Sequence, residues 1–262
     1  MKAKLVVFSC ALFVCVIAGT ALADVQPWPG TKWFQPPEME EEWGQDWCSQ
    51  LDSTGAAPTQ VVMDDWLCTD NTSPVKGFRW WGSYFNDHSI DDISGFHLSI
   101  HADIPAGAAA SHPAPGFLHQ QYFTLEELGY EEGGYQKYIG DDSYGSPVYE
   151  YFALFDECFW QTGTAADPVV YWVDIFAVID NADQDITNCV WGWHTSSTQN
   201  IDDAVKLIGY IPDTGEYTDF TVIEYAGHGS VDMAFEVIPE PSTLLLAVPA
   251  IFGLATVIRR RK

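Results

Sequence analysis

The run VVYWVDIFAVI, residues 169–179, restricts the fold of this chain more than any other feature. Its odd positions are all apolar, and this period of two marks the buried face of a β-strand. Its even positions include Trp172, Asp174 and Phe176, so that one carboxylate stands between two large rings on the other face. A strand with large aromatic side chains on both faces is either covered on two sides or exposes one aromatic face to solvent.

Strand signals of this kind recur along the body of the chain, and helical periodicity is scarce. Runs rich in apolar, β-branched and aromatic residues alternate with Gly, Pro, Asn and Asp. An acidic turn near residues 125–128 is the main helical candidate. Ten strands are predicted, at residues 60–67, 76–85, 94–102, 117–123, 148–157, 168–179, 188–194, 204–210, 218–225 and 231–238.

Ten strands without alternating helices predict an all-β fold. The expected architecture is an antiparallel β-sandwich of jelly-roll or immunoglobulin-like type over residues 59–238. Residues 24–58, rich in Pro, Trp and Glu, are expected to pack on it as an irregular N-terminal arm.

The charge balance narrows the classes of partner. The chain has 11 Lys and Arg against 37 Asp and Glu, a formal net charge of −26, and most of the cations lie at its two ends. The body between the ends is therefore more acidic than the whole chain. Such a surface repels nucleic acid, so we expect no nucleic-acid partner, and it suits divalent cations, neutral sugars or basic partners. With 15% aromatic and 47% hydrophobic residues, the chain can nevertheless form a core.

Both ends of the chain have the character of membrane signals. Two lysines, an apolar run and the small residues around Ala23 predict a signal peptide over residues 1–23. Residues 242–258 contain no charged side chain and would form a helix about 25 Å long, near the lower limit for crossing a bilayer. A cluster of cations follows at once and would keep the C-terminus in the cytoplasm; it consists of Arg259, Arg260, Arg261 and Lys262. We therefore expect an exported chain flanked by a signal helix and a membrane helix.

The C-terminal segment 239–262 also resembles a known signal. Pro239, Glu240 and Pro241, a short hydrophobic helix and an Arg-rich end are similar, in this order, to the PEP-CTERM sorting signal of Gram-negative bacteria. The resemblance implies recognition by the export machinery and by an exosortase-type processing enzyme, with the tail anchored in the inner membrane before processing. It implies delivery to the cell envelope, the surface or an extracellular matrix, where polysaccharide is a further expected partner.

The body resembles a second family. The blocks VVMDDWLCTD, GFRWWGSY, LSIHADIPAG, VYWVDIFAV and WGWHTS are similar, in order, to an uncharacterised domain of unknown function in secreted proteins of planctomycete-like bacteria. The resemblance spans roughly residues 30–205 and implies a β-sandwich module without an assigned activity. The expected function is therefore that of a non-enzymatic surface or matrix protein.

Four cysteines remain after removal of the signal peptide: Cys48, Cys68, Cys158 and Cys189. An even number of cysteines in an exported chain favours two disulfides. Proximity along the chain favours the pairs Cys48–Cys68 and Cys158–Cys189, while the other pairings stay open. A zinc site is the rival interpretation, but no two of these cysteines have the short spacing of zinc ligands.

Two candidate binding sites follow from the strand at 169–179. Sugars stack on flat aromatic rings while carboxylates bind their hydroxyls, so Trp172, Asp174 and Phe176 suggest a carbohydrate-binding module as an alternative function. The competing and commoner interpretation is that these rings belong to the core. Directly after the strand, Asp180, Asp183 and Asp185 are a possible calcium site, because carboxylates are hard oxygen ligands.

Other acidic pairs recur along the chain, at residues 64–65, 91–92, 141–142 and 202–203, and in so acidic a sequence we interpret them as chance. Calcium is thus a possible cofactor, and no other cofactor is indicated.

Signals of catalysis are weak. His97, Ser99 and His101 share one face of a predicted strand, but the apolar residues between them supply its buried face, so both histidines are expected to point to solvent. A secreted glycosidase is a remote alternative, since it needs two carboxylates across a cleft and the acidic composition alone gives it no specific support. We expect no enzymatic activity.

Overall fold

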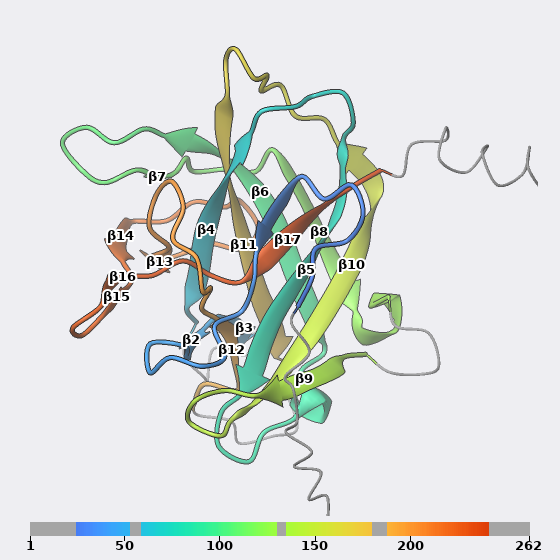
Figure 1. Cartoon of the computed structure of the whole chain (residues 1–262), viewed down its shortest axis with the longest axis vertical. Coiled ribbons are helices and arrows are strands. Elements are labelled where there is room, and N and C mark those ends of the chain that lie inside the picture. Colours follow the sequence, from blue (N-terminus) through green and yellow to red (C-terminus); the bar gives the residue numbers. More distant parts are fainter. Residues whose placement is uncertain (1–24, 53–58, 130–134, 180–187, 241–262) are drawn as a thin grey trace, which may run out of the picture.

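A computed structural model describes residues 25–52, 59–129, 135–179 and 188–240, and the fold is all-β (Figure 1). The strands form two large, mainly antiparallel sheets and one small hairpin. The helical elements of the described residues are two short 3₁₀ turns, η1 (Ile90–Asp92) and η2 (Leu125–Glu127). The second turn lies where the sequence suggested a helix.

The first large sheet has seven strands. Its main path runs through β1 (Trp33–Gln35), β17 (Phe235–Pro239), β5 (Val75–Tyr84), β10 (Pro147–Phe159) and β9 (Lys137–Asp141). Off this path, β12 (Trp191–His194) pairs with β5 and carries β2 (Asp46–Cys48) on its other side.

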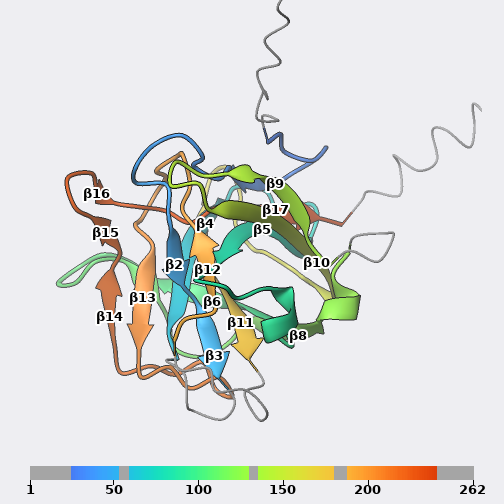
Figure 2. The ribbon, with the colours of Figure 1, turned by 90° about the horizontal axis from the view of Figure 1, so that it is seen from below.

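The second large sheet has eight strands. Its main path runs through β14 (Asp219–Val222), β13 (Val205–Ile208), β4 (Val61–Cys68), β11 (Val169–Ile179), β6 (Gly95–Ile104) and β7 (His112–Pro113). In addition, β3 (Gln50–Asp52) pairs with β11 in parallel, and β8 (His119–Thr124) pairs with β6. The small hairpin consists of β15 (Glu224–Tyr225) and β16 (Gly229–Ser230). The two large sheets curve around a common core (Figure 2).

The ten predicted strands are confirmed to within a few residues, but the prediction of an irregular N-terminal arm is wrong. The segment contributes β1 and β2 to the first sheet and β3 to the second. Each of these strands has three residues, which is too short for a period of two to stand out from the background.

The main core lies between the two sheets. Val173 and Ile175 from β11 point into it, as the alternation predicts, together with Trp66 from β4 and Trp80 from β5, all of them fully buried. Burial of each large apolar side chain stabilises the fold by about 1.5–3 kcal/mol.

The outer face of β11 is covered as well. Trp172 and Phe176 belong to a second buried cluster with Met63 of β4, Leu207 of β13 and Tyr210, which follows β13. The strand is therefore covered on both faces, which explains its aromatic side chains on both.

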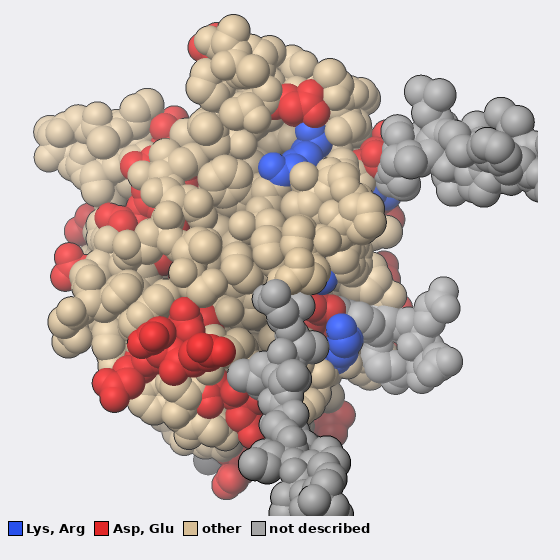
Figure 3. Space-filling model, in the orientation of Figure 1, with Lys and Arg blue, Asp and Glu red and all other residues tan. Residues whose placement is uncertain are grey.

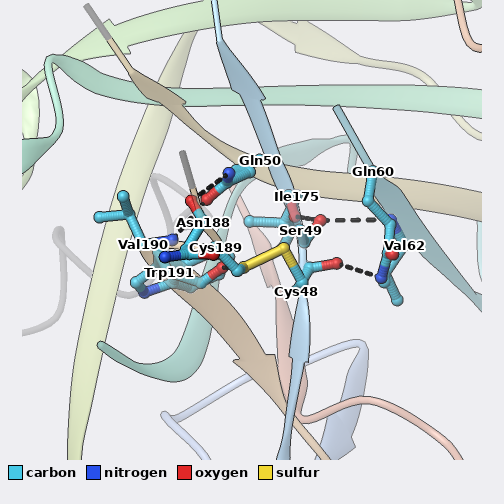
Figure 4. Close-up of a disulfide and its surroundings, with 10 residues drawn as sticks. All are labelled: Cys48, Ser49, Gln50, Gln60, Val62, Ile175, Asn188, Cys189, Val190 and Trp191. Atoms are coloured by element: carbon cyan, nitrogen blue, oxygen red, sulfur yellow. Dashed lines mark hydrogen bonds between the residues drawn. A yellow bond between two sulfur atoms is a disulfide. The ribbon is translucent and has the colours of Figure 1, made fainter. Parts of the chain in front are cut away.

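The disulfide joins Cys48 to Cys189, and the predicted pairs Cys48–Cys68 and Cys158–Cys189 are wrong (Figure 4). Cys68 and Cys158 are free thiols. The Gln60 amide donates to the Cys48 carbonyl at one end of β4, whereas Cys68 lies at the other end of this eight-residue strand. At about 3.4 Å per residue the two ends are roughly 27 Å apart, so closeness along the chain did not mean closeness in space.

Of the predicted sorting motif, Pro239 and Glu240 lie within the described residues. Pro239 closes β17 and pairs with Val75, and the exposed Glu240 donates its backbone N–H to the Pro74 carbonyl. The signal peptide, Pro241, the membrane helix at residues 242–258 and the cations that follow lie outside the described residues. Within the described ranges, no helix has the length and apolar character needed to span a membrane.

Candidate metal centre

Two carboxylates and one imidazole meet beside the β2–β12 ladder. Asp46 begins β2 and stands directly opposite His194, the last residue of β12. Asp142 follows β9. One ligand atom from each of these three side chains lies within 4.8 Å of the other two. The His194 ring is fully buried and Asp142 is 7% exposed.

The hydrogen bonds of His194 fix its orientation. Its Nε2 lies 2.6 Å from the Glu38 carbonyl oxygen, and its Nδ1 lies 3.0 Å from Asp46 Oδ1. A carbonyl oxygen can only accept, so Nε2 carries a hydrogen. Metal-binding histidines commonly donate one ring N–H to a carbonyl in this way and bind the metal through the other nitrogen. The ring of His194 thus presents Nδ1 to the Asp46 carboxylate, with Asp142 close by.

Asp142 is held by the tight turn between β9 and β10. Its Oδ1 accepts the backbone N–H groups of Tyr144 at 2.9 Å and of Ser146 at 2.8 Å. The turn also contacts the loop between β1 and β2, because the Ser143 hydroxyl donates to the Glu41 carbonyl. Segments from three distant parts of the chain therefore fix the three candidate ligands.

The surroundings of His194 favour positive charge. Burial alone would lower the pKa of His194, but the neighbouring Asp46 carboxylate outweighs it and the pKa is raised. Acidic side chains gather over the loop between β1 and β2, which carries the exposed Glu40, Glu41 and Glu42 (Figure 3). Such a concentration of negative charge attracts cations. One imidazole and two carboxylates suit Zn²⁺ or Mn²⁺ better than calcium, which prefers oxygen ligands throughout.

The predicted sugar-binding residues are not accessible. Trp172, Asp174 and Phe176 are each 0% exposed, so no sugar ring can stack on them. Their interpretation as an exposed aromatic platform is wrong, and the alternative assignment to the core is right. The predicted calcium ligands Asp180, Asp183 and Asp185 lie outside the described residues.

The prediction that both histidines of β6 point to solvent is also wrong. In the β6–β11 ladder, Ser99 stands opposite Asp174 and His101 opposite Trp172, so they share the covered face of the sheet. The ring of His97 stacks on Phe176 at 4.8 Å between centroids. Tyr210 and other side chains from later segments cover this face, which the alternation within one strand does not reveal.

A buried polar network surrounds Asp174. Its carboxylate accepts the backbone N–H of Ser99 at 2.8 Å, the Ser99 hydroxyl at 2.6 Å and the Tyr210 hydroxyl at 2.7 Å. The Nε2 atom of His101 lies 3.3 Å from the same carboxylate. Burial alone would raise the pKa of Asp174, but the contacts with His101 and His97 hold it well below its ordinary value.

This network contains the residue types of a hydrolytic triad without its arrangement. In a triad, histidine stands between serine and aspartate, whereas Ser99 donates directly to Asp174. Ser99 and His101 are both 0% exposed, so a substrate cannot reach the serine oxygen. The network holds β6, β11 and the segment after β13 together.

Sequence reasoning missed this candidate metal centre. Asp46, Asp142 and His194 lie far apart in the sequence and form no spaced motif. Two weak signals were present, since Asp142 belongs to a recurrent acidic pair and His194 directly follows Trp193 in the block WGWHTS. The pairing of β2 with β12 brings Asp46 to His194, and the turn after β9 adds Asp142.

The fold and the site define an all-β domain that contains a disulfide and in which two carboxylates and an imidazole lie close enough together to hold a metal ion. The chain belongs to the family described as a domain of unknown function, DUF7901, whose model matches residues 31–238. This confirms that the body is a domain of unknown function, and the match includes β1, β2 and β3. Neither a curated protein nor a solved structure matches the chain.

Proposed function

We propose that this chain is an exported, non-enzymatic protein of the cell surface or extracellular matrix, in which a jelly-roll or immunoglobulin-like β-sandwich binds a divalent transition metal ion. The observation that carries the metal site is the meeting of Asp46, Asp142 and His194 within 4.8 Å, with the second nitrogen of His194 held by the Glu38 carbonyl. Signals at both ends of the chain support export.

The role proposed for the metal is structural. The ion would tie β2, the turn after β9 and β12 to one point, and its binding energy would add to the stability of the folded state. The side chains of His194 and Asp46 are 0% and 8% exposed. Such limited access suits a closed structural site better than a catalytic site, which keeps a coordination position open to substrate.

Titration calorimetry with ZnCl₂ and with MnCl₂, on protein purified from cells that express the full chain, tests the metal site. We expect one equivalent of at least one metal to bind, and His194→Gln to weaken its binding at least about tenfold because an inner ligand is lost. The matched control is His228→Gln, which alters an exposed ring that stacks on Trp43 and should leave binding unchanged. Absence of binding, or equal binding by the His194 variant, contradicts the proposal.

Cell fractionation tests export and sorting. Deletion of residues 241–262 keeps β17 and the hydrogen bond from Glu240 to Pro74, so it removes the tail without cutting a strand. We expect the full chain in the envelope or matrix fraction and the shortened chain released from it. Retention of the shortened chain in the same fraction, or a full chain that stays in the cytosol, contradicts this part of the proposal.

Carbohydrate binding is the second candidate function, and two exposed rings now favour it. Tyr138 and Tyr144 are 55% and 58% exposed and flank Asp141 and Asp142. Their faces are available for stacking on a sugar. A glycan array with added metal and with chelator should then show binding that Tyr144→Ala removes. Absence of binding in both conditions excludes this candidate.

A further inference from the structure

A small hollow lies where β4 ends, between the segment that precedes β1 and the segment that follows β10. Its volume is about 250 Å³, and its lining includes Lys32, Trp66, Asp70, Ser73 and Gln161. None of these residues belongs to the candidate metal centre or to the pair of exposed tyrosines described above. Pockets for drug-sized ligands measure roughly 300–1,000 Å³, so a hollow of this size suits a smaller molecule.

Three polar atoms of residues that line this hollow have no hydrogen-bond partner. Gln161 is 4% exposed, and neither the nitrogen nor the oxygen of its side-chain amide has a partner. The indole N–H of Trp66, which is 0% exposed, has none either. Buried polar groups are nearly always hydrogen-bonded, because a bond left unmade carries the full cost of desolvation. Two such side chains on one hollow therefore indicate a polar molecule that completes their bonds.

Hydrogen bonds hold the walls of the hollow in place. The Lys32 Nζ donates to the Asp70 carbonyl at 2.8 Å. On the other side, the Asn71 amide donates to the Thr162 carbonyl at 3.3 Å, and the Thr162 backbone N–H donates to the Tyr171 hydroxyl at 3.0 Å. The site is thus largely formed before a ligand arrives, which reduces the entropic cost of binding.

The polar groups of the hollow include both donors and acceptors. Lys32 can only donate, the Asp70 carboxylate can only accept, and the Gln161 amide does both. Hydroxyl groups also donate and accept, so the neighbouring hydroxyls of a sugar match this mixed set. The Lys32 ammonium lies 3.9 Å from the Asp70 carboxylate, and the chain has a net charge of −26. This charge disfavours an acidic ligand and leaves a neutral sugar as the best match.

An exposed tryptophan stands next to the hollow in the chain. Trp160 directly precedes Gln161 and is 63% exposed, the highest value among the large apolar side chains of the described residues. The flat face of such a ring is available for stacking on a sugar. Consecutive Cα atoms are about 3.8 Å apart, so the side chain of Trp160 begins beside the wall that Gln161 forms. A second sugar unit that extends from the hollow is therefore within its reach.

We propose that this hollow binds one unit of a neutral sugar chain. Lys32, Trp66 and Gln161 bind its hydroxyl groups, and the ring of Trp160 stacks on the adjacent unit. The last side-chain torsion of glutamine is soft, so the amide of Gln161 can turn toward the ligand. The site has the same class of ligand as the second candidate function but none of its residues, so that either site can fail while the other stands.

Calorimetric titration with neutral tetrasaccharides tests the proposal on protein purified from cells that express the full chain. The probes are cellotetraose, maltotetraose, mannotetraose and xylotetraose, with tetragalacturonate as the acidic comparison. We expect at least one neutral probe to bind and the acidic one not to bind. The same probe should still bind to Tyr144→Ala, in which the other candidate sugar site is removed.

Variants made in the Tyr144→Ala background locate the binding. Gln161→Met keeps the length of the side chain without its amide, so it should fold and weaken binding at least about tenfold. Trp160→Ala removes an exposed ring and should weaken binding about three- to tenfold. The matched control is Tyr122→Ala, which removes a 41% exposed ring from β8 and should leave binding unchanged. Thermal unfolding checks that each variant is folded.

Three outcomes overturn the proposal. The first is that no neutral probe binds, in which case the hollow holds water alone. The second is full binding by a folded Gln161→Met variant. The third is binding that Tyr144→Ala abolishes, which assigns the sugar to the exposed tyrosines and leaves the second candidate function standing.

Discussion

Removal of the Cys48–Cys189 disulfide should cost the fold a large part of its stability. The bridge connects residues separated by 141 positions and so closes most of the body into one loop. In the chain-entropy model the stabilisation grows with the logarithm of the loop length, which gives about 5 kcal/mol at 25 °C for this span. Residual structure in the unfolded chain reduces the effect, so we expect a loss of about 3–5 kcal/mol for the double variant Cys48→Ser/Cys189→Ser.

Urea unfolding of the oxidised protein and of the double variant measures this loss. Such a loss is a large fraction of the 5–15 kcal/mol typical of folded domains. Cys158→Ser is the matched control, because Cys158 is a half-buried free thiol, and it should change the free energy of unfolding by less than about 1 kcal/mol. Peptide mapping after alkylation should find Cys68 and Cys158 modified. A loss below about 1 kcal/mol in the double variant, or a peptide that links Cys48 to Cys68, would refute the reasoning.

Two further predictions concern the buried carboxylates. Tyr210→Phe should lower the free energy of unfolding by about 1.5–3 kcal/mol, because its hydroxyl donates to the buried, ionised Asp174, whereas Tyr138→Phe removes an exposed contact and should cost under about 0.5 kcal/mol; equal losses in urea unfolding would argue against a special role for the network. The stability should also fall as the pH rises from 5 to 8. The folded-state pKa values of Asp65 and Asp232, about 8 and about 7, lie above the ordinary value of 3.8, so the folded state binds protons that the unfolded state has lost. Each such proton contributes a slope of about 1.4 kcal/mol per pH unit, and a flat or rising profile in urea titrations at several pH values would contradict it.

The long strands could be predicted from the sequence because each carries its own signal. The alternation in β11 identified the core face, on which Val173 and Ile175 lie. The same alternation could not show what covers the other face. The covering side chains include Tyr210, which follows β13, and Phe117, which lies between β7 and β8, so they come from other segments of the chain. The three-residue strands β1, β2 and β3 carry too few positions for any period to be recognised.

The candidate site and the buried acids were harder to predict, for two different reasons. The candidate ligands Asp46, Asp142 and His194 share no motif. Strand pairing places Asp46 opposite His194, and the turn after β9 brings Asp142 to them. Asp65 did carry a signal, because two consecutive acids within the apolar run VVMDDWLC must place a carboxylate on each face of the strand. Treating that pair as chance overlooked the fact that both faces of this strand are buried.

The pairing of β17 has a consequence for the order in which the chain acquires its structure. The ribosome makes β1 first, yet this strand pairs with β17, the last strand of the body, which also pairs with the central strand β5. Nascent chains that end before residue 235 therefore expose an open edge of β5, the kind of edge that recruits other chains into aggregates. The native state therefore cannot form until the final strand has been made. Chaperones that bind the unfinished chain until then would raise the yield of folded protein.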